Sequence, residues 1–383
     1  MTTPAPEIAL TGCRIFTGDE TLDRHAVVIG GGAIVDVVVE TSVPSAVKRR
    51  RLDGGLLAPG FVDLQVNGGG GVMFNHSLSV DGIRTIGEAH RRFGTTGFLP
   101  TLITDKRGTI PAAMVAVRDA IAQGVPGVLG VHIEGPFINV ERRGVHSPEA
   151  IRPIELADIA ELTSLGVGRT LVTLAPELVP HDLLLDLRNA GLHVAAGHTA
   201  ASYEEIIGAL SHGISGFTHL FNAMTPMESR APGVVGAALD DPDSWCGLIV
   251  DGHHVSPATL RVAIAAKPRG KMFLVTDAMA TVGAEERSFD LYDQTITEID
   301  GRLSTADNRL AGSSLDMASA VRNTVQLLRQ PLDEALRMAS LYPASFIGLG
   351  DRIGRIAPGY RADLVLLDDE INVLDTWIGG NGR

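Results

Sequence analysis

The chain has 383 residues, 45% of them hydrophobic, and a formal net charge of −13. This length allows one to three domains with a large core, and the negative charge disfavours nucleic-acid or anionic-membrane binding, which need basic surface. Cys13 and Cys246 are too far apart for a disulfide framework, and "MTTPAPEIAL" lacks the pattern of a secretory signal, so we expect a cytoplasmic enzyme or binding protein.

Short strands separated by turns are predicted at both ends of the chain. Residues 7–55 contain "IALTGCRIFTG" and "HAVVIGGGAIVDVVVE", and the last stretch, "APGYRADLVLLDDEINVLDTWIGG", has the same character. Neither end makes a convincing domain alone. We therefore predict a small β-sandwich domain formed by both chain termini, residues 1–57 and 356–383, with residues 58–355 as a second domain.

The middle of the chain repeats an apolar, strand-like run eight times. The runs are 61–66, 97–103, 127–135, 169–177, 193–199, 216–223, 245–252 and 272–278. Near-continuous apolar strands that alternate with helices indicate a parallel sheet. Eight such units predict an α/β fold, a (β/α)8 TIM-type barrel.

Most gaps between these runs carry helix-like patterns. In "SYEEIIGALSHG", Ser202 is a predicted N-cap, Glu205 completes a capping box, and Gly213 ends the helix. The gaps 224–244 and 279–313 are longer than a simple helix, and we predict that both are functional insertions over the barrel mouth.

Polar side chains recur where the apolar runs end. They are Gln65 and Asn67, Thr101, Glu134, Glu177, His198, His219, His253 with His254, and Asp277. The carboxyl ends of barrel strands meet at one mouth, where the active site of such a barrel lies. A lone histidine at a strand end is more often structural, but seven or eight converging ends indicate a functional site.

A divalent metal ion suits these side chains. Zinc is commonly held by three histidine or carboxylate ligands, with a fourth position open to water. We predict Glu134, His198 and His219 as these ligands, from the third, fifth and sixth runs. A helix cap or a salt bridge is the alternative for Glu134. His132 is predicted either as a neighbour of the site or as a packed core histidine.

Asp277 ends the eighth run, in "LVTDAM". A metal lowers the pKa of water from about 15.7 towards about 7, so a modest base beside it can accept the water's proton. We predict Asp277 as this base, with a metal ligand or a helix cap as the alternative.

Nine motifs occur in order along the chain: "PGFVDLQVNGGGG", "HIEGPF", "GVHSP", "AAGHTAA", "THLFNAM", "RAPGVVGA", "DGHHV", "LVTDAM" and "LAGSSL". Together they resemble the N-acetylglucosamine-6-phosphate deacetylase branch of the amidohydrolase superfamily, over essentially the full length. Some members of this branch carry His-x-His on the first strand and hold two metals, whereas others carry Gln-x-Asn and hold one. Gln65 and Asn67 match the second pattern, which implies one divalent ion per chain: zinc, with Fe²⁺, Mn²⁺ or Co²⁺ as alternatives.

The resemblance also implies substrate contacts. His146 matches a histidine near the reacting carbonyl, and Arg230 matches the phosphate-binding arginine. The other matched positions are Val145 at a backbone contact, Asn222, Ala223 and His254 around the sugar phosphate, and Leu310, Ala311 and Gly312 near the acetyl group. From the residues alone, Val145 and Leu310 could equally be packing residues, and Arg230 could be a solvated surface charge.

The implied reaction is hydrolysis of N-acetyl-D-glucosamine 6-phosphate to D-glucosamine 6-phosphate and acetate. Asp277 would accept and return a proton, and His146 with the metal would stabilise the oxyanion. Two alternatives stay open: an amidohydrolase acting on N-acetylgalactosamine 6-phosphate or an N-acyl amino acid, and a non-catalytic barrel that binds sugar phosphate. Strand four ends "LAPE", without the lysine of cyclic-amide hydrolases. The resemblance also implies a homodimer.

Overall fold

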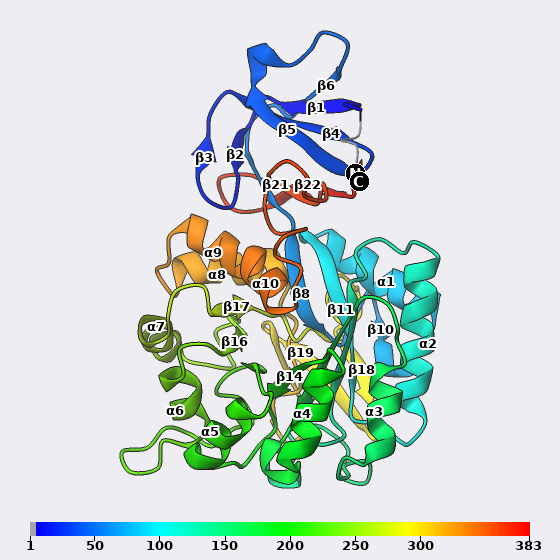
Figure 1. Cartoon of the computed structure of the whole chain (residues 1–383), viewed down its shortest axis with the longest axis vertical. Helices are drawn as coiled ribbons and strands as arrows, with labels where there is room; N and C mark the ends of the chain where they lie inside the picture. Colours follow the sequence, from blue (N-terminus) through cyan, green and yellow to red (C-terminus); the bar gives the residue numbers. More distant parts are fainter. Residues whose placement is uncertain (1–4) are drawn as a thin grey trace.

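Eight parallel strands follow one another around a barrel in the computed structural model, which describes residues 5–383 (Figure 1). They are β8 (Phe61–Val66), β11 (Thr95–Ile103), β12 (Gly130–Glu134), β13 (Arg169–Leu174), β14 (His193–Ala196), β15 (Gly216–Phe217), β16 (Trp245–Leu248) and β17 (Met272–Leu274). The last strand returns to the first, because Val66 bridges Ala278 and the Asp277 amide donates to the Gln65 carbonyl at 3.0 Å. The predicted (β/α)8 barrel is confirmed.

Helices follow the barrel strands and cover the outside of the barrel (Figure 1). They are α1 (Val80–Arg91), α2 (Thr109–Ala122), α3 (Leu156–Thr163), α4 (His181–Asn189), α5 (Tyr203–Ser211), α6 (Gly233–Asp240), α7 (Pro257–Ala266), α8 (Met317–Gln326), α9 (Leu332–Ala339) and α10 (Leu341–Phe346). The predicted capping box of α5 is confirmed: Ser202 accepts from the Glu205 amide at 3.2 Å, and Glu205 accepts from the Ser202 amide at 2.7 Å. Within residues 5–383, no helix is long and apolar enough to cross a membrane.

The sixth strand is much shorter than the predicted run 216–223. Only Gly216 and Phe217 form β15, because His219, Phe221 and Ala223 have backbone φ angles of 31°, 80° and 51°. Such left-handed conformations end a strand. The change of direction brings His219 onto the barrel mouth.

His132 lies in the polar interior of the barrel. Its Nε2 is 2.8 Å from Thr173 Oγ1, and its Nδ1 is 3.3 Å from Thr101 Oγ1. Burial lowers the pKa of His132 to about 4, so the ring is neutral. His132 is therefore a packed core histidine that is hydrogen-bonded to two threonines.

Two further sheets lie above the barrel in Figure 1 and contain strands from the first and last parts of the described chain. One sheet is formed by β1 (Ile8–Thr11), β4 (His25–Gly30), β5 (Ala33–Val39) and β6 (Lys48–Arg51). The other is formed by β2 (Arg14–Phe16), β3 (Thr21–Leu22), β7 (Leu56–Pro59), β21 (Leu364–Leu367), β22 (Val373–Ile378) and β23 (Asn381–Gly382). Leu10, Ile29, Leu57, Leu364 and Trp377 belong to one buried core in these sheets. We call this part the sandwich.

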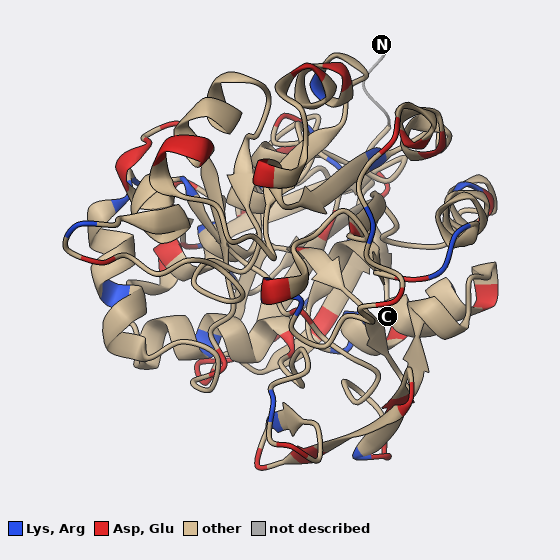
Figure 2. Cartoon of the chain, turned by 90° about the horizontal axis from the view of Figure 1, so that it is seen from below, with Lys and Arg blue, Asp and Glu red and all other residues tan. Residues whose placement is uncertain are grey.

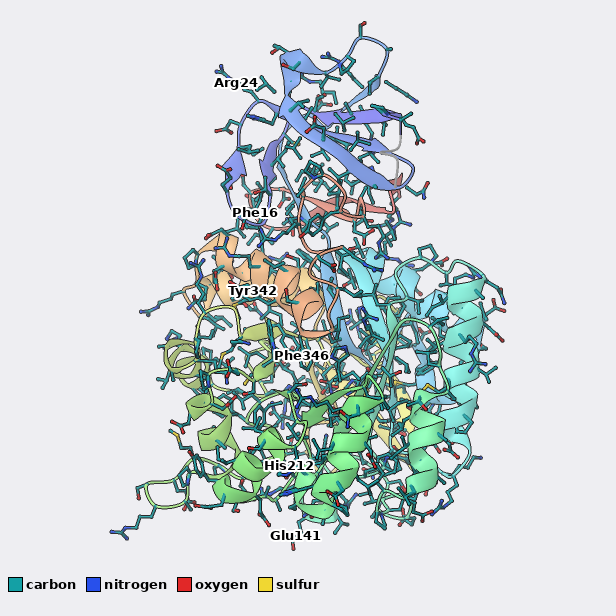
Figure 3. The ribbon with its side chains drawn as sticks, in the orientation of Figure 1. Phe16, Arg24, Glu141, His212, Tyr342 and Phe346 are labelled. Atoms are coloured by element: carbon teal, nitrogen blue, oxygen red, sulfur yellow. The ribbon has the colours of Figure 1, made fainter. Side chains whose placement is uncertain are left out.

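Arginines of the barrel hold the sandwich through main-chain carbonyls. Arg91 of α1, Arg322 of α8 and Arg337 of α9 are the donors. The acceptors are the carbonyls of Gly18, Glu370, Ile371, Thr376 and Asn381, at 2.8–3.1 Å. Arg337 also stacks on Phe16, whose place at the lower edge of the sandwich is labelled in Figure 3. The contacts fix the sandwich at the amino end of the barrel, opposite the mouth.

The two long gaps are built differently. Residues 224–244 contain a loop and then α6, so this segment holds the regular helix of the sixth unit. Residues 279–313 contain an antiparallel sheet of β18 (Ser288–Leu291), β19 (Gln294–Ile299) and β20 (Arg302–Ser304). We call this sheet the flap. Tyr292 of the flap donates to the Thr104 carbonyl at the end of β11.

Candidate active site

Glu134, His198 and His219 converge at the barrel mouth. Glu134 ends β12, and the two histidines follow β14 and β15 by two residues each. Glu134 Oε1 lies 3.2 Å from His198 Nε2 and 3.0 Å from His219 Nε2, and the two Nε2 atoms are 3.1 Å apart. All three side chains are buried, and their ligand atoms lie within 4.8 Å of one another.

The protonation pattern of this cluster fits a cation. His198 Nδ1 lies 2.8 Å from the Arg142 carbonyl, which can only accept, so Nδ1 carries the hydrogen and Nε2 presents a lone pair. That lone pair faces the Glu134 carboxylate and His219 Nε2. Two imidazoles and one carboxylate form a suitable ligand set for a divalent ion such as zinc.

The first-strand amides connect this cluster to Asp277. Gln65 Nε2 lies 3.1 Å from each Glu134 oxygen and 3.0 Å from Asp277 Oδ1. Asn67 Nδ2 donates to the same Asp277 oxygen at 2.6 Å. Burial, followed by the charge of Glu134, raises the pKa of Asp277 to about 6. Asp277 is therefore a carboxylate with raised basicity, held in place by two amides.

His146 faces the same cavity as a neutral donor. The Thr104 amide donates to His146 Nδ1 at 3.4 Å, and Thr104 Oγ1 lies 2.7 Å from the same nitrogen. Because Nδ1 is an acceptor, the ring hydrogen lies on Nε2. Burial lowers the pKa of His146 to about 3. The side chain can therefore donate a hydrogen bond across the whole neutral range of pH.

His254 is oriented by Asp251, a residue that the sequence analysis did not identify. His254 Nδ1 donates to Asp251 Oδ2 at 2.6 Å, while Asp251 Oδ1 accepts from the amides of His253 and His254. Burial would raise the pKa of Asp251, but the hydrogen bond and charge of His254 hold it at about 2. The signal was present in "DGHHV", where an acidic residue precedes the two histidines.

Three of the chemical groups lie on strained backbone. His198, His219 and Asp277 have φ angles of 49°, 31° and 53°, in the left-handed region that disfavours side chains. Each such residue costs on the order of 1–3 kcal/mol, and such strain is concentrated at functional sites. The barrel therefore tolerates local strain in order to aim these three side chains at one point.

A cavity of about 380 Å³ joins these groups. Its lining contains the predicted residues Glu134, Val145, His146, His198, His219, Asn222, Ala223, His254, Asp277, Leu310 and Gly312. It also contains Ile103, Gly144, Met279, Arg302, Asn308 and Arg309, which the sequence analysis missed. Ile103 ends the second apolar run and Arg309 directly precedes "LAGSSL", so both positions carried a usable signal.

Four predicted residues lie away from this lining. Gln65 and Asn67 are buried and act on the site through Glu134 and Asp277, and Ala311 is buried in the apolar cluster of the flap. Arg230 is exposed, on the loop before α6, and does not line the cavity of its own chain.

Charges of both signs are mixed at the lower end of the molecule. Glu141, in the loop between β12 and His146, lies at this end in Figure 3. Seen from below, basic and acidic segments are interspersed around the barrel (Figure 2).

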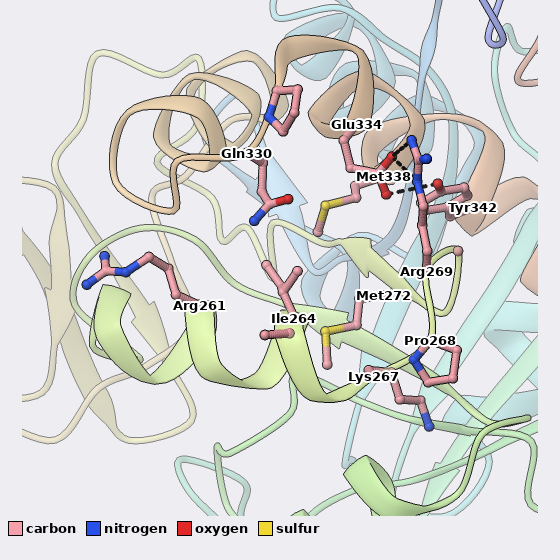
Figure 4. Close-up of a pocket in the computed structure, with 13 residues that line it drawn as sticks. Arg261, Ile264, Lys267, Pro268, Arg269, Met272, Gln330, Glu334, Met338 and Tyr342 are labelled. Atoms are coloured by element: carbon pink, nitrogen blue, oxygen red, sulfur yellow. Dashed lines mark hydrogen bonds and ion pairs between the residues drawn. The ribbon is translucent and has the colours of Figure 1, made fainter.

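A second cavity lies beside the amino end of β17 (Figure 4). Its volume of about 430 Å³ is slightly larger than that of the cavity at the mouth. However, Arg269 donates to Glu334 Oε2 at 2.6 Å and Tyr342 donates to Oε1 at 2.9 Å, so these polar groups satisfy one another. We place the active site at the mouth, where the titratable groups converge.

Two known family models match this chain. A model described as "Amidohydrolase family" matches residues 56–382. The chain belongs to the amidohydrolase family. A second model, described as "NagA composite domain", matches residues 8–57, in the amino-terminal part of the sandwich.

Relatives of this amidohydrolase match it along nearly the whole chain. An N-acetylgalactosamine-6-phosphate deacetylase from Shewanella sp. (strain ANA-3) is 40% identical, covering 96% of this chain and 94% of that protein. An N-acetylglucosamine-6-phosphate deacetylase from Haemophilus influenzae is 39% identical, covering 98% and 99%. The crystal structure of N-acetylglucosamine-6-phosphate deacetylase from Pasteurella multocida has a TM-score of 0.95 at 37% identity, covering 98% and 99%.

Proposed function

We propose that this amidohydrolase hydrolyses the N-acetyl group of N-acetyl-D-glucosamine 6-phosphate, giving D-glucosamine 6-phosphate and acetate. The observation that carries the proposal is the placement of Asp277 beside the Glu134–His198–His219 cluster at the floor of a cavity. The full-length similarity to deacetylases of phosphorylated N-acetyl sugars supports the choice of substrate.

Glu134, His198 and His219 would hold one divalent ion per chain. Their donor set favours zinc, and Fe²⁺, Mn²⁺ and Co²⁺ accept the same ligands. A bound ion supplies a Lewis acid and lowers the pKa of water from about 15.7 towards about 7. Gln65 and Asn67 stabilise the charged carboxylates beside it.

Asp277 accepts a proton from the attacking water and later delivers it to the leaving amine. The His146 Nε2–H donates to the carbonyl oxygen of the acetamide and stabilises the charge that develops there. Because burial holds the pKa of His146 near 3, this donor stays neutral while the reaction proceeds. Thr104 fixes the ring orientation.

The wider part of the cavity would hold the sugar phosphate. We assign the sugar contacts to Val145, Asn222, Ala223 and His254, and the contacts near the acetyl group to Leu310 and Gly312, with Ala311 packed behind them. Arg230 is assigned to the phosphate. Since Arg230 lies outside the cavity of its own chain, this contact requires either closure of its loop or a second copy of the chain.

A second candidate substrate is N-acetylgalactosamine 6-phosphate. It is favoured by the Shewanella relative, whose name specifies the galactosamine compound and whose identity is 40%. The two sugars differ only in the direction of one hydroxyl group, so the same metal cluster, base and oxyanion donor serve both.

We further propose a homodimer that works in the cytoplasm. Cys13 and Cys246 are both free and buried, which is typical of proteins from a reducing compartment. Light scattering would give the oligomeric state.

Acetate release from the two phosphorylated sugars and from unphosphorylated N-acetylglucosamine tests the proposal, with metal analysis of the same protein. We expect kcat/KM for N-acetylglucosamine 6-phosphate to exceed that for the unphosphorylated sugar by at least about tenfold, the effect of about 1.4 kcal/mol. A preference for the galactosamine compound would select the second candidate. Release of no acetate from any of the three by metal-loaded protein would contradict both.

A further inference from the structure

One wall of the cavity at the mouth is apolar. It consists of the side chains of Ile103, Val145, Met279 and Leu310, and we call it the apolar wall. Ile103 and Met279 are its most buried members, each 2% exposed. The lining also contains Asn222, His254, Arg302, Asn308 and Arg309, which are polar or charged.

The apolar wall stands beside the groups that act on the amide. Ile103 pairs with Glu134 across β11 and β12, and Thr104, the next residue, holds His146 Nδ1. Met279 is two residues beyond Asp277. Gly312 packs against both Met279 and Asp277, because a Cβ at this position would lie 2.6 Å from Met279 Cε and 3.0 Å from the Asp277 carbonyl. Ile103 and Met279 therefore flank the place where the carbonyl carbon must react.

Tight packing behind the apolar wall holds Ile103 and Met279 in position. Ile103 and Met279 belong to a buried cluster with Met73, Leu291, Ile296, Leu303 and Ala311. Flap residues thus fill the space behind the wall. Tightly packed side chains of this kind do not move aside without cost, so the wall sets a fixed limit to the cavity.

We propose that Ile103 and Met279 set the length of the acyl group that this enzyme removes, so that acetyl fits and longer chains are rejected. The inference rests on the proposed deacetylation. The methyl carbon and the amide nitrogen are separate substituents of the planar carbonyl carbon and point away from one another, and the sugar phosphate needs the polar residues of the lining. The methyl group therefore faces the apolar wall, and each additional methylene has to displace Ile103 or Met279.

The first experiment uses the unmodified enzyme, loaded with metal. The N-acetyl, N-propionyl and N-butyryl forms of glucosamine 6-phosphate are compared by release of the amine. One methylene more or less in an apolar pocket changes kcat/KM by about 10-fold to 200-fold, so we expect at least about a tenfold fall for each added carbon. Equal rates for acetyl and butyryl would overturn the inference.

The second experiment uses Met279→Ala, which shortens the apolar wall and so enlarges the cavity beside it. We expect the ratio of kcat/KM for the butyryl over the acetyl compound to rise by at least about tenfold. Met73→Ala is the matched control, because Met73 is also 2% exposed and lies in the same cluster but does not line the cavity. That variant suffers a comparable loss of packing, and its ratio should stay as in the unmodified enzyme.

A milder variant guards against misfolding of Met279→Ala. Ile103→Val removes one carbon and should raise the propionyl-to-acetyl ratio, with a smaller effect on butyryl. If variants that still release acetate keep the ratios of the unmodified enzyme, Ile103 and Met279 do not limit the acyl group. Release of amine from none of the amides by the unmodified enzyme is a different result, since it contradicts the proposed function and removes the basis of the acyl inference.

Discussion

Asp277 combines a buried position with a charge that the reaction needs. Its pKa is raised to about 6 by burial and by Glu134, while His219, His254 and the Asn67 amide act in the opposite direction. A base must be deprotonated, so kcat/KM should be level above about pH 7 and fall as the pH decreases through about 6. A bound cation lowers the pKa of Asp277 and therefore moves this fall of kcat/KM to lower pH. A pH profile of kcat/KM checks the prediction, and an acid limb centred above about 7 would contradict it.

The same raised pKa has a consequence for stability. A carboxyl group with a folded pKa above its unfolded value stabilises the fold below the unfolded pKa, and this contribution is lost as the pH rises through about 6. In metal-free protein at pH 8, Asp277→Asn should therefore raise the free energy of unfolding by up to about 3 kcal/mol, and at pH 4 most of this gain should be lost. The same variant should lose about 10²–10⁴-fold in kcat. Urea unfolding at both pH values, with steady-state kinetics, measures both effects.

Gln65 and Asn67 place amide hydrogens where related barrels place imidazole ligands. The unmodified protein should therefore bind close to one divalent ion per chain. Gln65→His combined with Asn67→His restores the two-metal pattern and should raise the metal content towards two, because Glu134 and Asp277 already flank the position. Gln65→Leu with Asn67→Leu removes the amides without adding ligands and should stay near one. Metal analysis of all three proteins tests this prediction. A content of two ions per chain in the unmodified protein would contradict the one-metal site.

Sequence patterns located Glu134, His198, His219 and Asp277 because each stands at the end of an apolar run, which is a local property. They did not locate Asp251, whose function depends on a side-chain contact with His254. Arg230 illustrates the same limit, since the path of its loop depends on contacts outside the loop. Chemistry carried by strand ends can be predicted from sequence, whereas contacts between loops need the structure.

At the scale of elements, Glu177 connects two loops of the active site. Its carboxylate accepts from Asn139 Nδ2 at 2.9 Å, from the Ala200 amide at 2.7 Å and from Thr199 Oγ1 at 2.5 Å. Asn139 precedes the loop that carries His146, and Thr199 follows His198, one of the proposed metal ligands. Glu177, a strand-end residue of the sequence analysis, therefore holds His198 in position through its neighbours.

Removing this carboxylate should weaken metal binding. In Glu177→Ala the three donors lose their acceptor and His198 gains freedom, so we expect the metal Kd to rise by about 10-fold to 100-fold, the usual effect of outer-shell changes. Excess metal should restore most of the lost kcat. Glu177→Gln keeps one acceptor oxygen, so its metal Kd should lie between the values for the unmodified protein and for Glu177→Ala. Competition with a chelator measures the Kd, and an unchanged value in Glu177→Ala would refute the role.

Each of the eight predicted runs contains a strand, but β13, β14, β15, β16 and β17 end three to six residues before the predicted ends. The run 216–223 has the composition of a strand, yet three left-handed residues stop β15 after Phe217. Composition cannot show this, because the strain is imposed by the placement of His219. The flap was predicted only as an insertion of residues 279–313, since its three short strands stabilise one another by pairing and not by a continuous apolar pattern.

For the whole molecule, the exposed position of Arg230 makes a prediction about assembly. If the chain is a homodimer and Arg230 serves the partner's cavity, two defective variants should complement each other. Asp277→Asn lacks the base, and Arg230→Ala should raise KM for the phosphorylated sugar by at least about tenfold. Co-expressed at equal levels, half of the dimers would be mixed and would contain one intact site each, or about a quarter of the normal number.

Assayed below KM, the mixed preparation should exceed the average of its two parents. Arg230→Lys, which keeps the charge, should still raise KM for the phosphorylated sugar if the arginine binds the phosphate through two hydrogen bonds. An activity equal to the parental average would place Arg230 over its own cavity. A normal KM in Arg230→Ala would remove it from phosphate binding altogether.

Substitutions at the interface between the sandwich and the barrel have different consequences on its two sides. Arg91, Arg322 and Arg337 donate to carbonyls that belong to the main chain of the sandwich. A carbonyl is present whatever side chain its residue carries, so these main-chain contacts tolerate substitutions in the sandwich. The contacts of the same arginines with the side chains of Phe16, Asn372 and Thr376 do not. A sandwich grafted from a distant relative should therefore dock onto this barrel if its backbone follows the same path and it keeps the side chains that match Phe16, Asn372 and Thr376.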